Sequence, residues 1–93
     1  MERLLDKDVM EALLVEVVGL LEAKCGESGE EVVVEILRRY KLVLERIRGL
    51  EVVVAEDFRE IRTLSRMYLE TSSDYMQDFL EAMGRVEALL KWS

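Results

Sequence analysis

Apolar residues recur at steps of three and four along four stretches of this 93-residue chain, and only short breaks separate the stretches. Such spacing is typical of α-helices, where residues three and four positions apart lie on the same side. The chain contains no proline and only five glycines, so few residues interrupt helix formation. The pattern predicts an all-α protein: an up-and-down bundle of four helices, forming a single helical-bundle domain over residues 1–93.

The four helices are expected at about residues 4–24, 30–48, 52–70 and 74–92. Gly26 is placed to cap the end of the first helix, and the oxygens of Thr71–Asp74 to cap the start of the fourth. Because the connections are short, consecutive helices are expected to run antiparallel. The second helix has the clearest apolar face, formed by Val33, Ile36, Leu37, Tyr40, Val43, Leu44 and Ile47.

The start of the third helix is ambiguous. The β-branched run Val52–Val54 favours a strand locally. No other segment is a strong strand candidate, however, so a strand here would have nothing to pair with. The helical spacing of Val54, Phe58 and Ile61 therefore favours a helix that already begins at about residue 52.

The first helix is apolar on most of its sides. Between Val9 and Leu21 only Glu11, Glu16 and Gly19 are not apolar. This stretch of 13 residues is too short and too charged to cross a membrane, which needs about 20 apolar residues. The helix is expected to be either central in the bundle or part of an interface in a homodimer or larger complex. The candidate interface residues are Val9, Leu13, Val15, Val17, Val18 and Leu20.

The net charge of −7 disfavours nucleic acid as a partner, because nucleic-acid binding needs a basic surface. The densest basic segment, Arg38–Arg48, is interrupted by Glu45 and preceded by Glu35. Its spacing is typical of a solvated helix face with ion pairs such as Glu35 with Arg39. A local basic stripe can still act on a partner, so a nucleic-acid adaptor using this face stays an alternative.

Catalytic and metal-binding patterns are missing from the sequence. There is no histidine, and Cys25 is the only cysteine, so neither an intrachain disulfide nor a cysteine-based metal site can form. A reducing cytoplasm suits such a chain. Carboxylate pairs with helical spacing, such as Glu56 with Glu60 and Asp74 with Asp78, fall on polar faces. The sequence therefore predicts no cofactor, no metal and no enzyme activity.

Two classes of function follow from these features. The favoured class is a non-catalytic protein-interaction module, an adaptor or small subunit that self-associates through apolar helix surface. The alternative is a small-molecule-binding or enzymatic bundle with a cavity lined by tyrosines and paired acids.

The abundance of Glu and Arg, with Gln77 as the only side-chain amide, is typical of a thermophilic source.

The segment Tyr68–Phe79, which reads YLETSSDYMQDF, resembles the helix–turn–helix signature of a small archaeal family of unknown function. Val54–Phe58 is similar to the start of that family's middle helix, so the resemblance covers roughly residues 47–92. Ser73 stands where the family has glycine, Asp78 stands where it has a small residue, and the intervening helix is about one turn short. The resemblance implies a compact helical bundle and no particular activity.

Overall fold

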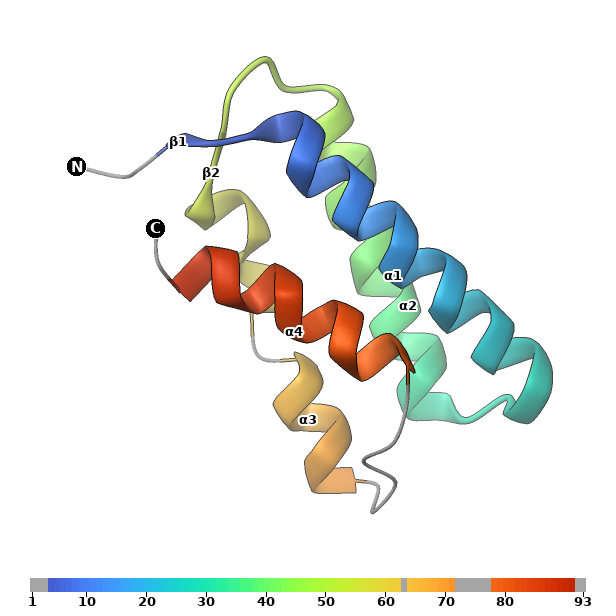
Figure 1. Ribbon diagram of the computed structural model, residues 1–93. Helices are drawn as coiled ribbons and strands as arrows, with labels where there is room; N and C mark the ends of the chain where they lie inside the picture. Colours follow the sequence, from blue (N-terminus) through green and yellow to red (C-terminus); the bar gives the residue numbers. More distant parts are fainter. Residues whose placement is uncertain (1–3, 63, 72–77, 92–93) are drawn as a thin grey trace.

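The computed structural model describes residues 4–62, 64–71 and 78–91 (Figure 1). The fold is all-α, as predicted, with a two-stranded sheet of minimal length at one end. Its elements, in chain order, are β1 (Leu4–Leu5), α1 (Lys7–Ser28), α2 (Glu31–Arg48), β2 (Val53–Val54), the 3-10 helix η1 (Ala55–Ile61), α3 (Leu64–Thr71) and α4 (Asp78–Lys91).

α1 begins and ends at residues with clear capping geometry. The carboxylate of Asp6 accepts a hydrogen bond of 3.2 Å from the backbone N–H of Val9, which satisfies one free donor of the first turn. The helix ends at Gly29 rather than at Gly26, so the predicted cap was wrong by three residues. Gly29 has a φ of 64°, a left-handed conformation that glycine adopts without strain, and its N–H donates to the carbonyl of Cys25.

α1 and α2 lie side by side and antiparallel, and α4 packs against α1 (Figure 1). α1 therefore has helical neighbours on its core side only, and its other side carries exposed residues. α2 buries one face only, and the residues on that face are the predicted ones: Val33, Ile36, Leu37, Tyr40, Val43, Leu44 and Ile47.

The third segment departs from the predicted continuous helix. Val53 and Val54 form β2, which pairs antiparallel with β1 in the register Leu4 with Val54 and Leu5 with Val53. The predicted helix was wrong at its start because Leu4 and Leu5, which had been assigned to the first helix, supply the partner strand. The β-branched run therefore keeps the extended conformation that it favours locally.

After β2 the chain turns into η1. The backbone N–H of Val54 donates a hydrogen bond of 2.9 Å to the carboxylate of Asp57, which holds the first turn. Phe58 and Ile61 are fully buried, so η1 presents the apolar side predicted for this segment. η1 packs against α2, and α3 contacts both α2 and α4.

The described core consists of hydrophobic side chains, and no charged residue of the described ranges is buried in it. Tyr68 of α3 and Phe79 of α4 meet edge-to-face, with ring centroids 5.1 Å apart and an interplanar angle of 81°. This contact joins the last two helices. The predicted fourth-helix start at Asp74, like the pairing of Asp74 with Asp78, lies outside the described residues; within them α4 begins at Asp78.

Candidate interaction surfaces

The six predicted interface residues of α1 divide into three groups. Val17 and Val18 lie in the core of their own chain, with exposed fractions of 0% and 8%. They are therefore not available to a partner while the chain is folded. Leu13 and Leu20 are half-buried and pack against the core. Val9 and Val15 are each 46% exposed and extend into solvent.

The exposed side of α1, opposite its core side, carries mostly small or apolar residues. We call Val9, Ala12, Val15, Gly19 and Ala23 the α1 outer face; all five are exposed. Of the exposed acids along α1, Glu16 and Glu22 form ion pairs with neighbouring helices. Glu16 accepts a hydrogen bond of 3.0 Å from Arg85 of α4, and Glu22 lies 3.9 Å from the ammonium group of Lys41 of α2.

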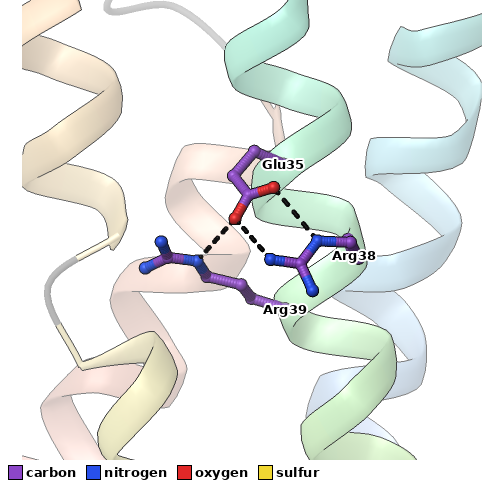
Figure 2. A network of polar contacts seen from close by, with 3 residues as sticks. All are labelled: Glu35, Arg38 and Arg39. Carbon is purple, nitrogen blue, oxygen red and sulfur yellow. Dashed lines mark hydrogen bonds and ion pairs between the residues drawn. The ribbon is translucent and has the colours of Figure 1, made fainter.

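The exposed side of α2 is polar and organised around Glu35. Figure 2 shows this carboxylate between two arginines of the same helix. Arg38 donates two hydrogen bonds to it, of 2.7 and 3.1 Å, and Arg39 donates one of 3.0 Å from its Nε. The hydrogen bonds from Arg38, and next the hydrogen bond from Arg39, lower the pKa of Glu35 to about 2. The predicted pair of Glu35 with Arg39 is confirmed, and the contact with Arg38 adds to it.

A second ion pair joins α2 to η1. Arg46 lies 2.7 Å from the carboxylate of Glu60 and also donates to the backbone carbonyl of Asp57. The hydrogen bond from Arg46 lowers the pKa of Glu60. Near the end of α2, Arg48 donates to Glu11 of α1 at 3.0 Å. The basic segment Arg38–Arg48, the candidate nucleic-acid face, therefore contacts a carboxylate at each of its arginines and at Lys41.

Two shallow hollows lie along α2. The one nearer its N-terminus, the acidic hollow, has a volume of about 370 Å³ and is lined by Glu31, Val34 and Glu35. The one nearer its C-terminus, the basic hollow, has a volume of about 270 Å³; Arg38, Arg39, Leu42, Arg46 and Glu60 line it. Each hollow contains one aliphatic side chain that is about half exposed, Val34 at 49% and Leu42 at 50%.

Val34 and Leu42, two exposed aliphatic residues, were not among the residues predicted at an interface. Both lie on the polar side of a strongly amphipathic helix, so each is an apolar residue out of phase with the buried face. That phase difference is visible in the sequence, because Val34 and Leu42 stand between the positions of the core pattern. Leu4 and Val52, at 65% and 56%, are also exposed, beside the small sheet.

The carboxylates and the thiol of the described residues lie apart from one another. Among them, no three His, Cys, Asp or Glu side chains come together as a metal site. Glu56 and Glu60, one of the candidate carboxylate pairs, are engaged separately by Arg59 and Arg46. Cys25 is a half-buried free thiol that packs against the core.

One buried polar atom is unusual. The hydroxyl of Tyr40 is buried and has no hydrogen-bond partner among the described residues. Burial, and then the negative charge of Glu87, raise the pKa of Tyr40.

No helix in the described part of the chain combines the length and the apolar character that spanning a membrane requires. Comparisons with protein-family models, curated proteins and solved structures give no match to this chain. The resemblance to the archaeal helical family therefore stays a prediction.

Proposed function

We propose that this chain is a non-catalytic protein-interaction module, an adaptor or small subunit, that self-associates through the apolar outer face of α1. The observation that carries the proposal is the exposure of Val9 and Val15 on a helix whose opposite side already fills the core. Apolar residues on both sides of a helix are typical of a helix that has neighbours on both sides.

The small residues of this face support the proposal. Gly19 lies in the interior of α1, where a glycine costs about 1 kcal/mol relative to alanine. A Cβ atom added at Gly19 would meet nothing within 4 Å, so nothing in the described chain requires a glycine there. Together with Ala12 and Ala23, it leaves a flat strip along which another backbone can approach closely.

Sedimentation equilibrium over a range of protein concentrations tests the proposal. We expect the wild-type chain to form dimers or larger species. We expect Val15→Glu to shift it towards the monomer, because the substitution places a charge on the contacting face. The matched control is Val52→Glu, which makes the same change at an exposed valine beside β2 and is expected to leave association unchanged.

A wild-type chain that stays monomeric at every concentration would refute self-association. Equal loss of association in both variants would point to a general effect of added negative charge and would count against the α1 outer face in particular.

A further inference from the structure

The two hollows of α2 have opposite chemistry and lie on the same side of one helix. The acidic hollow offers the carboxylates of Glu31 and Glu35 beside Val34. The basic hollow offers three guanidinium groups beside Leu42, with Glu60 as its only acid. Each hollow therefore combines an excess of one charge with one half-exposed aliphatic side chain.

Some charged groups of these hollows have no ion-pair or hydrogen-bond partner among the described residues. Arg38 and Arg39 share the single carboxylate of Glu35, and Arg39 uses only its Nε, so its two Nη groups make no hydrogen bond within the described ranges. Glu31 forms no ion pair with any residue that the structure describes. Glu31 and Arg39 are eight residues apart, or about 12 Å along the helix, so they do not meet each other.

We infer that a second copy of this chain docks against α2 in the antiparallel direction, with each acidic hollow against the partner's basic hollow. The inference rests on the self-association proposed above and names a further surface and an orientation for it. Val34 and Leu42 stand four residues to either side of Arg38. A two-fold axis near Arg38 therefore brings Val34 of each copy towards Leu42 of the other copy.

A second copy of the chain fits these hollows better than a nucleic acid does. One helix carries both halves of the surface, so a single two-fold rotation forms two identical contacts at once. A nucleic acid would bring its phosphates against Glu35 and Glu60, which lie among the arginines, and against a chain of net charge −7. Complementary charge between the copies also fixes their relative direction.

Charge substitutions in the two hollows test the inference by sedimentation equilibrium at low ionic strength. Glu31→Lys removes the net charge of the acidic hollow, and Arg39→Glu removes that of the basic hollow. Each is expected to weaken dimerisation about tenfold, because the two-fold axis repeats the loss of an exposed pair worth about 0.7 kcal/mol. Arg66→Glu, on α3, makes the same change as Arg39→Glu away from both hollows and is expected to have no effect.

Mixing the two variants gives the decisive result. In the mixed dimer, the intact basic hollow of the Glu31→Lys chain meets the intact acidic hollow of the Arg39→Glu chain, and the two altered hollows, which have lost their net charge, meet each other. We expect the equimolar mixture to dimerise more tightly than either variant alone, which loss of folding cannot produce. Arg39→Gln removes the positive charge without adding an acid beside Glu35, so it is expected to weaken dimerisation less than Arg39→Glu does. Circular dichroism monitors the fold of each variant.

The outcomes separate this inference from the proposed function. If neither hollow variant changes dimerisation while Val15→Glu abolishes it, the α2 contact is overturned and the α1 outer face stands. If the variants weaken dimerisation but their mixture does not restore it, the antiparallel arrangement is overturned. A wild-type monomer at every concentration overturns both proposals.

Discussion

The ammonium group of Lys7 donates a hydrogen bond to the backbone carbonyl of Leu50, 43 residues further along the chain. It also lies 3.4 Å from the carbonyl of Arg48, the last residue of α2. Carbonyls at a helix C-terminus lack partners within the helix, and a cation there is favourable. Lys7, in the first turn of α1, thus supplies a hydrogen-bond donor to the carbonyls at the C-terminal end of α2.

We expect Lys7→Met to lower the free energy of unfolding by about 1 kcal/mol, since methionine keeps much of the aliphatic stem but leaves these carbonyls without their donor. Urea unfolding followed by circular dichroism measures the change. Lys41→Met is the control, because its exposed contact with Glu22 at 3.9 Å is expected to contribute less than about 0.5 kcal/mol. Equal losses of unfolding free energy in the two variants would show that the contact of Lys7 with the end of α2 contributes no more than an exposed ion pair.

Tyr40→Phe is expected to leave the protein as stable as the wild type or to stabilise it by up to about 1 kcal/mol. The Tyr40 ring is fully buried, but its hydroxyl has no hydrogen-bond partner among the described residues, so the folded state gains little from that hydroxyl. Thermal and urea unfolding of the two proteins give the difference. A clear loss of stability would mean that the hydroxyl has a partner after all, such as a bound water.

The same tyrosine predicts a dependence on alkaline pH. Burial raises the pKa of Tyr40 in the folded state, whereas a tyrosine of the unfolded chain ionises near its ordinary value of about 10. Above that pH the unfolded state binds fewer protons than the folded state, so stability falls as the pH rises. The unfolding free energies of wild type and Tyr40→Phe, measured from pH 8 upwards, should differ by a constant amount below about pH 10. Above that pH the wild type should become progressively less stable relative to Tyr40→Phe.

The low pKa of Glu35 predicts a loss of stability at acidic pH. Its pKa is about 2 in the folded state, below the ordinary value of 4.5. The folded state therefore binds fewer protons at this site, and the stabilisation is present above about pH 4.5 and is lost as the pH falls towards 2. Carbon-detected NMR of the side-chain carboxyl should give the low pKa, and Arg38→Gln should raise it. A Glu35 that titrates near 4.5 in both proteins would contradict the hydrogen-bonded arrangement of Figure 2.

The sequence predicted α2 well and α1 less well, for a physical reason. In α2 the polar and apolar residues alternate with the helical period, so the buried face could be identified residue by residue. In α1 apolar residues surround the helix, and periodicity alone cannot separate the side that faces α2 and α4 from the side that faces solvent. Val17 and Val18 were therefore grouped with Val9 and Val15, although the fold buries the first two and exposes the others.

Local sequence patterns could not predict the small sheet or the ion pairs between different elements. Two-residue strands are too short to show an alternating pattern, and the pairing of Leu5 with Val53 depends on contacts across the whole first half of the chain. The pair of Glu35 with Arg39 follows from spacing within one helix, whereas Arg46 with Glu60 requires knowing that η1 turns back onto α2. Sequence separation thus decided which parts of the candidate surface could be predicted.

The pairing of β1 with β2 also has a consequence for synthesis on the ribosome. Leu4 is made early, but its partner Val54 emerges only after α1 and α2 have been translated. The contacts between α1 and α2 are nearest in sequence and can form first, whereas β1 must wait as an unpaired segment. Until α4 follows, the side of α1 that it covers stays open, so a nascent chain presents more apolar surface than the finished one.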